Sequence, residues 1–316
     1  MNDRVLIVGS VALDDIKTPW TEEKNLLGGS AVYGSIAASQ FAGVDIVGVI
    51  GDDFPAEHLD LLKRSGVNID GVESQAGKTF HWGGEYHQNM NDRTTHFTEL
   101  GVFAEFMPKI PASYREDGFV FLANIDPDLQ LKVLDQVKKP RLTLLDTMNL
   151  WINIKRETLV EVIKRVDALM INEEEANLLF PSPSQADSAG KLLDLGLGRV
   201  IIKKGSNGAQ MFSREGTFAV PALPLKDVKD PTGAGDTFTG GLIGYLAGCG
   251  RCGEGASPAD VDMAFRQAML VGSACASYVV EDFSTRRINT LTHDKIKERV
   301  GQLYAAIQCE PVKLKK

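Results

Sequence analysis

Residues 226–241 read KDVKDPTGAGDTFTGG, and this stretch predicts both the fold and the chemistry of the chain. Asp230 and Pro231 interrupt regular structure, Thr232 can cap a helix, and the small residues 233–235 then open one. The first N–H groups of a helix have no partner within it, and the helix dipole adds partial positive charge there. Because glycine and alanine let a ligand approach the backbone closely, the stretch predicts a phosphate-binding helix start.

Asp236 follows directly, in the first turn of the predicted helix, where a carboxylate would repel a bound phosphate. One interpretation is that Asp236 only complements the helix dipole, which contributes about 0.3–1 kcal/mol. The other is that it acts as a general base and takes the proton from a hydroxyl group that attacks phosphorus. On the second interpretation, the backbone amides hold the phosphate and the carboxylate accepts the proton.

The predicted helix continues as FTGGLIGYLAG, with Gly240, Gly241 and Gly244. Each glycine costs about 1 kcal/mol of helix propensity relative to alanine. Their presence therefore indicates close packing or close approach of a ligand. The chain contains neither the Walker P-loop pattern nor a GxGxxG fingerprint, so those two modes of nucleotide binding lose their main support.

The composition is that of a globular protein and excludes several classes of partner. The 316 residues are 43% hydrophobic and 24% charged, and no linker separates two cores, so we expect one domain over residues 1–316. A net charge of −8 argues against nucleic-acid binding. There is no apolar run of roughly 20 residues and no signal peptide, so we expect no membrane partner and a cytoplasmic location. Four cysteines agree with a reducing compartment, and Cys249 and Cys252 form a CGRC that is either a redox pair or a solvated loop.

Short apolar runs alternate with segments of helical periodicity along most of the chain. Nearly continuous hydrophobic strands suit a parallel sheet that is covered on both faces. The order predicts an α/β fold, a doubly wound and mostly parallel sheet with helices on both faces. The chain beyond residue 230 is predicted to be helical, with a Ser-Pro cap at 257–258. The predicted strands are residues 4–9, 44–51, 118–123, 141–147, 167–172 and 199–205.

Residues 78–100 break this rhythm, because polar and aromatic residues alternate there around a QNMND turn. The pattern predicts an antiparallel hairpin that stands away from the main sheet and is joined by residues 11–27. These two segments would form a small β lid over a pocket. The alternative is a surface hairpin that only covers a sheet edge.

Four motifs, in order, resemble those of the ribokinase/PfkB family of carbohydrate and nucleoside kinases. DPTGAGDTFTGG resembles the second signature of the family and GGSAVYGSIAAS (28–39) the first. NEEEA (172–176) resembles the family's N-x-x-E element, and KKGSNGA (203–209) its nucleotide-contacting strand and turn. The resemblance covers nearly the whole chain and implies a ribokinase-like fold.

The resemblance implies a role for each matching residue. Asp236 would deprotonate the acceptor hydroxyl, and Gly233, Ala234 and Gly235 would form an anion hole for the transferring phosphoryl group. Asp14 would grip substrate hydroxyls, although Asx turns after strands are common.

The glycine pair and the nucleotide loop have implied roles as well. Gly28 and Gly29 would let the backbone meet the substrate, or would form a simple turn before a helix that Ser30 caps. Lys203, Gly205, Ser206 and Gly208 would lie along the nucleotide, although Lys203 would also suit a solvated strand end.

Two pairs of residues match cation-associated positions of the family. Asn172 and Glu175 would act near Mg²⁺-bound phosphates, mostly through water, and their spacing also fits a capping box. Asp230 and Thr232 match positions that bind a monovalent cation such as K⁺ in many members.

The chain departs from the family pattern at positions that would contact the substrate. Tyr33 stands where many sugar kinases have an asparagine, and LLDTMNLW (144–151) lacks an arginine found in some of them. Asn124 would add a hydroxyl contact or serve a turn before Asp126. Aromatic residues alternate on the predicted lid and would cover a flat base or an apolar sugar face, or pack within the lid: Phe80, Trp82 and Tyr86.

These observations favour an ATP-dependent, Mg²⁺-requiring kinase that phosphorylates a hydroxymethyl group of a small sugar. A nucleoside kinase of the same fold, with an adenosine-like acceptor, is the alternative. A non-catalytic nucleotide-binding protein is the rival of another class, but its expected mark, loss of the base or of the anion-hole glycines, is absent. By resemblance, a homodimer through the lid is also expected.

Overall fold

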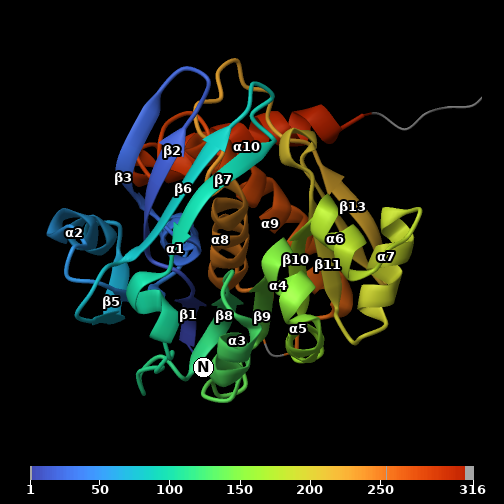
Figure 1. Cartoon of the computed structure of the whole chain (residues 1–316). Helices are drawn as coiled ribbons and strands as arrows, with labels where there is room; N and C mark the ends of the chain where they lie inside the picture. The colour runs from blue at the N-terminus through green and yellow to red at the C-terminus, as the bar shows by residue number, and fades with distance from the viewer. Residues whose placement is uncertain (1, 254, 310–316) are drawn as a thin grey trace, which may run out of the picture.

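A computed structural model describes residues 2–253 and 255–309. Within these residues, nine strands form one sheet in the order β13-β12-β11-β10-β9-β8-β1-β4-β5 (Figure 1). The pairings from β11 to β5 are parallel, whereas β12 and β13 at one edge are antiparallel. The strands are β1 (Asn2–Val8), β4 (Val44–Ile50), β5 (Val67–Ser74), β8 (Asp117–Leu122), β9 (Leu142–Asp146), β10 (Ala168–Asn172), β11 (Arg199–Lys203), β12 (Ala209–Ser213) and β13 (Gly216–Val220).

The sheet is buried on both faces because successive side chains of a strand point to opposite sides. In β1, Val5 and Ile7 belong to one hydrophobic core, and Leu6 and Val8 belong to the other. The first core is covered by α1 (Ser30–Ala38), α2 (Ala56–Arg64), α8 (Ala234–Gly248), α9 (Pro258–Val279) and α10 (His293–Ile307). The second is covered by α3 (Pro127–Leu134), α4 (Asn149–Ile154), α5 (Arg156–Ile163), α6 (Glu173–Leu179) and α7 (Gln185–Leu193).

The architecture confirms the predicted α/β class with a mostly parallel sheet. All six predicted strands are present within about two residues of their expected ends, and Ser257 caps α9 through the backbone N–H of Asp260. Sequence patterns did not reveal the strands β5, β12 and β13 or the short helices α4 and α7. Within residues 2–253 and 255–309, no helix is both long enough and apolar enough to span a bilayer.

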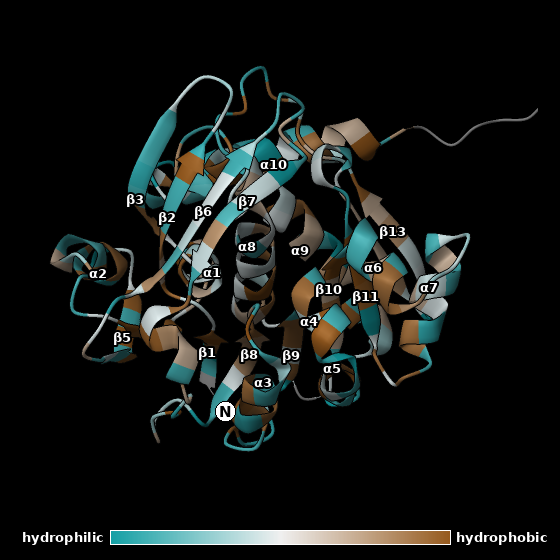
Figure 2. Ribbon diagram, viewed as in Figure 1, coloured by the Kyte–Doolittle hydropathy of each residue, from teal (hydrophilic) through white to brown (hydrophobic). Residues whose placement is uncertain are grey.

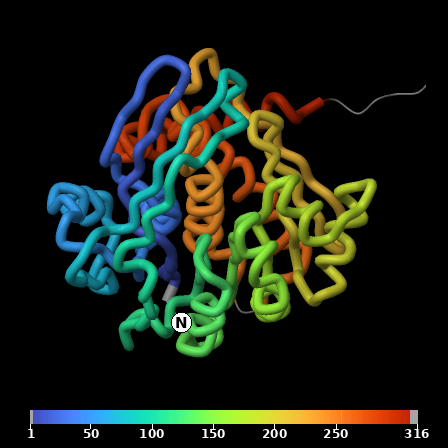
Figure 3. The backbone as a smooth tube through the Cα atoms, viewed as in Figure 1, coloured from blue at the N-terminus to red at the C-terminus, as the bar shows by residue number. Residues whose placement is uncertain are grey.

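A second, smaller sheet stands beside the main one. It joins β2 (Ala12–Lys17), β3 (Glu22–Gly28), β6 (Phe80–Tyr86) and β7 (Arg93–Glu99) in the order β3-β2-β6-β7. The predicted hairpin is β6–β7, but β2 runs parallel to β6, so the sheet is mixed. Figure 3 shows these distant segments side by side, and Figure 2 shows that β3 and β7 are mainly hydrophilic. We call this sheet the lid.

Helix α8 packs against α1 through glycine. A Cβ on Gly240 would lie 2.2 Å from the carbonyl oxygen of Gly34, and one on Gly244 would lie 2.6 Å from Cα of Ala38. No side chain fits at these distances, so the two backbones are in direct contact. Close helix packing therefore explains these glycines, and it places the starts of both helices at the same edge of the sheet.

We predict that Gly240→Ala destabilises the protein by roughly 1–3 kcal/mol, because a methyl group would force α8 away from α1. The matched control is Gly190→Ala in α7, where a Cβ would meet nothing within 4 Å. The control should be neutral or stabilising by up to about 1 kcal/mol. Chemical denaturation of both variants measures the difference, and equal effects would contradict the packing argument.

Candidate active site

Polar residues gather where the parallel strands of the main sheet end. Asp146, Asn172 and Lys203 are the last residues of β9, β10 and β11, which are neighbours in the sheet. Open α/β sheets bind ligands beyond the carboxyl ends of their strands. The start of α8 and the lid strand β2 reach the same edge (Figure 1).

The start of α8 differs in detail from the expected cap. Gly233, not Thr232, is the N-cap residue, and its φ of 73° is a left-handed conformation that favours glycine. A Cβ at Gly233 would lie 2.4 Å from the Tyr33 ring. The N–H of Ala234 donates to Pro231 O at 3.1 Å, so the proposed anion hole is left with the amides of Gly233 and Gly235.

Thr232 instead ties the helix start to its surroundings. Its N–H donates to Oδ1 of Asp230 at 2.9 Å, and its hydroxyl donates to the Tyr86 hydroxyl of the lid at 3.1 Å. The second oxygen of Asp230 accepts from the N–H of Ser284 at 3.2 Å. Burial raises the pKa of Asp230 to about 6. These bonds organise the loop, and a monovalent cation at Asp230 and Thr232 stays a prediction.

Asp236 lies in the first turn of α8, as predicted. It is partly accessible to solvent, yet burial, reinforced by the charge of Asp146, raises its pKa to about 7. Lys203 and Arg93 oppose this shift. Within the part of the chain that the structure describes, Asp236 has no ion-pair partner. A carboxylate with a pKa near neutrality and no fixed partner is suited to accept a proton.

Asp14 lies against the glycine pair. A Cβ on Gly28 would sit 2.0 Å from Oδ2 of Asp14, so only glycine leaves room for this carboxylate. Burial, and then the charges of Asp230 and Asp236, raise the pKa of Asp14 well above its usual range. Gly29, with φ 104°, is the N-cap of α1. A buried carboxylate of this kind gains from bound hydroxyl groups that donate to it.

Ser30 does not cap α1, contrary to one of the two interpretations of this turn. It is the first helical residue, and no side chain caps the helix start. Its hydroxyl is hydrogen bonded to the hydroxyl of Ser10 at 3.1 Å. The bond joins the end of β1 to α1.

Two further predicted substrate residues have different surroundings. The Tyr33 hydroxyl is buried and has no hydrogen-bond partner among the described residues, and it lies in the field of Asp230 and Asp14. The side chain of Asn124 is already engaged, since its Oδ1 accepts from Trp151 Nε1 at 3.0 Å and its amide group contacts Met148 Sδ at 3.2 Å. The Tyr33 hydroxyl therefore has an unmet hydrogen-bonding capacity among the described residues, whereas Asn124 holds neighbouring side chains.

Asn172 and Glu175 form a capping box at the start of α6. Each side chain accepts the backbone N–H of the other residue at 2.8 Å. Burial raises the pKa of Glu175 to about 7. Among the described residues no group of three His, Cys, Asp or Glu side chains could hold a metal alone. Mg²⁺ commonly uses one or two carboxylates together with water and phosphate, and the second carboxylate oxygen of Glu175 fits that mode.

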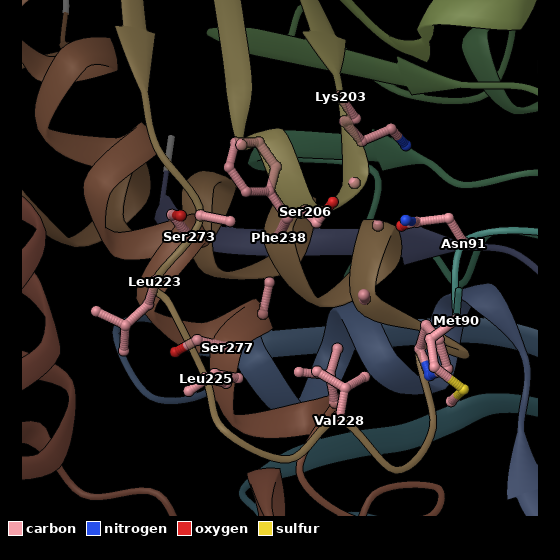
Figure 4. A pocket seen from close by; sticks show the side chains of 18 of the residues that line it. Met90, Asn91, Lys203, Ser206, Leu223, Leu225, Val228, Phe238, Ser273 and Ser277 are labelled. Carbon is pink, nitrogen blue, oxygen red and sulfur yellow. The ribbon is translucent and has the colours of Figure 1, made fainter. Parts of the chain in front are cut away.

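A cavity of about 420 Å³ opens from the start of α8 (Figure 4). Lys203, Gly205, Ser206 and Gly208, the residues predicted to follow the nucleotide, all line it. The walls are mainly apolar, which suits a base, and its volume is in the usual range for ligand sites. The remaining lining residues include Ala222, Leu223, Leu225, Val228, Phe238, Ser273, Ala276, Ser277 and Val280.

Comparison with known proteins identifies the family. The model of the pfkB family of carbohydrate kinases matches residues 20–291. This chain belongs to the pfkB family. It is therefore a kinase that phosphorylates a hydroxyl group, on a ribokinase-like fold.

Individual relatives are similar over most of their length. A cytidine kinase of Thermococcus kodakarensis is 34% identical over 253 residues, 77% of this chain and 89% of its own. The crystal structure of a Methanocaldococcus jannaschii nucleoside kinase superposes with a TM-score of 0.74 at 22% identity, covering 95% of this chain and 98% of that one. An E. coli protein assigned provisionally as a ribokinase II, solved with ATP and Mg²⁺, gives 0.77 at 19% identity over 96% and 100%.

The structure of this pfkB kinase adds residues that sequence reasoning missed. Met90 and Asn91, at the tip of the lid hairpin, line the cavity opposite Leu223 (Figure 4). A Cβ on Gly205 would lie 3.0 Å from Oδ1 of Asn91, so the lid reaches the nucleotide loop. Arg93, on β7, acts electrostatically on Asp236. Nothing local in the hairpin sequence indicates these contacts.

Asp146 was missed although a signal was present. It follows the hydrophobic run of the predicted strand 141–147 and is the last residue of β9, at the edge where ligands bind. Its Oδ2 accepts from Lys203 Nζ at 2.5 Å. The strand-end rule alone would have marked it as a candidate.

The CGRC lies away from the site. Cys249 is the C-cap of α8, at the opposite end of the helix from Asp236. Both cysteines are free, and a hydrogen bond with Cys252 lowers the pKa of Cys249 to about 6. The kinase site does not include this pair.

We predict that Asp236→Asn lowers kcat by about 10²- to 10⁴-fold, because the variant cannot accept the acceptor's proton. The substitution should not lower the stability of the folded protein. Burial raises the pKa of Asp236, so the ionised form costs stability as pH rises from the usual carboxyl range through about 7. The melting temperature of the variant at pH 8 should therefore equal or exceed that of the wild type. Full turnover by the variant would place the base elsewhere.

We also predict a pH dependence. Only the ionised form of Asp236 accepts a proton, and its pKa is about 7 in the free protein. A plot of kcat/KM against pH should therefore rise about tenfold per unit below that value and level off above it. A profile that stays flat down to about pH 5.5 would show that the base has an ordinary carboxyl pKa.

Proposed function

We propose that this pfkB kinase transfers the γ-phosphoryl group of ATP to the hydroxymethyl group of a nucleoside. The observation that carries the proposal is that Trp82 of β6 pairs in register with Asp14 of β2 in the lid. Similarity to a cytidine kinase and to a nucleoside kinase supports the same acceptor class.

Trp82 presents a flat ring on the inner face of the lid. Residues that pair in register have side chains on the same face of a sheet, so Trp82 and Asp14 share a face. A Cβ on Gly84 would lie 2.3 Å from the Trp82 ring, so the glycine lets the indole lie flat along β6. The ring packs beside the buried cluster of Ile16, Leu26, Tyr86 and Phe283 and is itself partly buried.

This arrangement suits a sugar joined to a base. Asp14 would accept hydrogen bonds from ribose hydroxyls, and the Tyr33 hydroxyl, which has no described partner, would add another contact. The Trp82 ring would stack on the base, and stacking contributes about 1–3 kcal/mol per base. A free pentose would bring no base to the ring, over which the Arg93 guanidinium lies with its Cζ 5.8 Å from the ring centroid.

The donor side of the proposal rests on the cavity. ATP would occupy it with its base among the apolar residues from Leu223 to Val280 and its phosphates toward Lys203 and Gly235. Left-handed φ values of 53° at Gly205 and 89° at Gly208 form the turn beside the phosphates. The complex of the E. coli relative with ATP and Mg²⁺ supports this donor.

Catalysis would combine positioning, proton transfer and charge stabilisation. Asp236 would take the proton of the acceptor hydroxyl as its oxygen attacks the γ-phosphorus. The amides of Gly233 and Gly235 would donate to the phosphoryl oxygens as charge develops. When bound, Mg²⁺ neutralises phosphate charge, and Glu175 and Asn172 would hold its water shell. The Thr232–Tyr86 hydrogen bond keeps the lid over the site, where it would exclude water.

A small sugar remains the second candidate acceptor. Asp14 and Gly28 would recognise the hydroxyls of a free sugar as readily as those of a nucleoside. The family description as carbohydrate kinases favours neither acceptor class over the other.

The proposal is tested with purified protein, MgATP and a panel of cytidine, uridine, adenosine, inosine, ribose and fructose. We expect at least one nucleoside to exceed both sugars in kcat/KM by about tenfold or more, as the stacking free energy requires. A sugar that matches or exceeds every nucleoside would establish the second candidate. Binding of ATP with transfer to no acceptor would favour the non-catalytic alternative.

We predict that Trp82→Ala raises KM for the preferred nucleoside by about 5- to 100-fold through loss of stacking. Trp20→Ala is the matched control, because Trp20 is 68% exposed in the turn between β2 and β3 of the same lid. Steady-state kinetics with both variants measure the difference. Equal KM values for Trp82→Ala and wild type would remove the stacking platform from the proposal.

A further inference from the structure

We propose that Lys203, held in place by Asp146, is the cation of this kinase that neutralises the migrating phosphoryl group. Lys203 would touch the reacting group, and Asp146 would act through it as a positioning residue. The inference rests on the kinase activity and on ATP as donor, and it is independent of which acceptor is used.

The ammonium group of Lys203 lies at the mouth of α8. Lys203 lines the nucleotide cavity, and its Nζ is 3.2 Å from the point that a Cβ on Gly235 would occupy (Figure 4). Any larger residue at 235 would crowd the ammonium group away from the helix start. The ammonium group and the free amides at the start of α8 are therefore close together, and one anion could accept hydrogen bonds from both.

Asp146 fixes the position of this ammonium group. Its Oδ2 accepts from Lys203 Nζ at 2.5 Å, and its Oδ1 accepts from the N–H of Thr147 at 2.9 Å. The side chains of Lys203 and Asp146 are 18% and 5% exposed. Buried Gln130 donates to the carbonyl oxygens of Asp146 at 3.1 Å and of Ala123 at 3.0 Å, which anchors the end of β9.

The pair meets across the end of β10. Asp146 is in register with Met170 of β10, and Lys203 is in register with Asn172. Lysine has three rotatable donors, and Asp146 takes one of them, so donors remain for a ligand in the cavity. Asp146 already restricts the Lys203 side chain in the free protein. Phosphate binding would therefore cost less side-chain conformational entropy.

Local charge also favours this role over a purely structural one. A buried ion pair alone is weak support for stability, because both groups must lose their water. Here one ammonium group faces three carboxylates, those of Asp146, Glu175 and Asp236. Burial lowers the pKa of Lys203, but these carboxylates outweigh burial and raise the pKa above its usual value, so the group stays charged. MgATP would enter a site that is rich in negative charge, and Lys203 would offset part of the charge repulsion on its phosphates.

In the reaction, the bond between the γ-phosphorus and the β,γ-bridging oxygen breaks and a bond to the acceptor oxygen forms. The acceptor proton passes to Asp236, and ADP leaves with the bridging oxygen. Lys203 keeps its proton throughout and donates hydrogen bonds to the transferring group.

The test uses the full chain with four variants: Lys203→Met, Lys203→Arg, Asp146→Asn and the double variant Lys203→Met/Asp146→Asn. Lys191→Met is the control, since Lys191 lies on α7, away from the site, and its Nζ pairs with Oδ2 of Asp187 at 2.8 Å. With the acceptor phosphorylated most efficiently by the wild type, Lys203→Met should lower kcat by about 10²- to 10³-fold. Lys203→Arg should recover part of this loss, and Lys191→Met should behave as wild type.

Whether the kcat losses of the single variants add in the double variant shows if Asp146 acts by positioning Lys203 or through a general structural effect. Asp146→Asn should lower kcat by about tenfold or more, and the double variant should be no slower than Lys203→Met alone, because Asp146 acts through the lysine. The double variant also removes both charges of the pair, so it remains informative if the single lysine variant does not fold. Multiplied losses in the double variant would overturn the positioning role of Asp146.

A binding measurement that needs no acceptor completes the test. Calorimetric titration with MgATP and with MgADP should show that Lys203→Met weakens ATP binding about tenfold and ADP binding less than about threefold, since only ATP carries the γ-phosphoryl group. Wild-type kcat and wild-type ATP affinity in this variant would overturn the inference. Failure of the wild type to bind ATP would instead overturn the proposed donor.

Discussion

The site depends on the direct contact between α1 and α8. Gly240 and Gly244 let the α8 backbone touch Gly34 and Ala38, so the two helices begin side by side at one edge of the sheet. The Tyr33 ring then lies against Gly233, one turn after the glycine pair at 28 and 29. The turn at Gly28 and Gly29 and the turn at Gly233 are therefore fixed relative to each other by backbone contact, which leaves little freedom for either to move.

Buried carboxylates set the electrostatics of this edge. Asp14, Asp230, Asp236 and Glu175 all have raised pKa values, and burial is the largest cause in each case. Bringing so many acids together costs free energy, and under the proposed mechanism the gain would be a base with a pKa near neutrality and a strong attraction for cations. Lys203, paired with Asp146, lies among these carboxylates, and Arg93 lies on the lid.

The lid connects the two halves of the site. The Tyr86 hydroxyl is hydrogen bonded to Thr232 beside the start of α8, Asn91 lies against the 205–208 loop, and Trp82 lies beside Asp14. One small sheet thus contacts the regions that we propose for the donor, the reacting groups and the acceptor. Because β2 and β6 pair in parallel, both lid segments return to the main sheet at the same edge.

The sequence by itself determined the alternation of strands and helices, the lid segments and the residues around the α8 start, because those signals are local. Hydrophobic periodicity, turn residues and the DPTGAGDTFTGG stretch act over a few residues. Local patterns did not determine which residues cap the helices. Thr232 and Ser30 were candidate N-caps, but Gly233 and Gly29 occupy those positions. The two hydroxyl groups are instead hydrogen bonded to Tyr86 and Ser10, which are distant in sequence. Only the tertiary structure decided that Asp146 meets Lys203, 57 residues away, and that the lid tip reaches the cavity. Strand order and sheet twist bring those groups together. The residues next to each group in the sequence do not specify either feature.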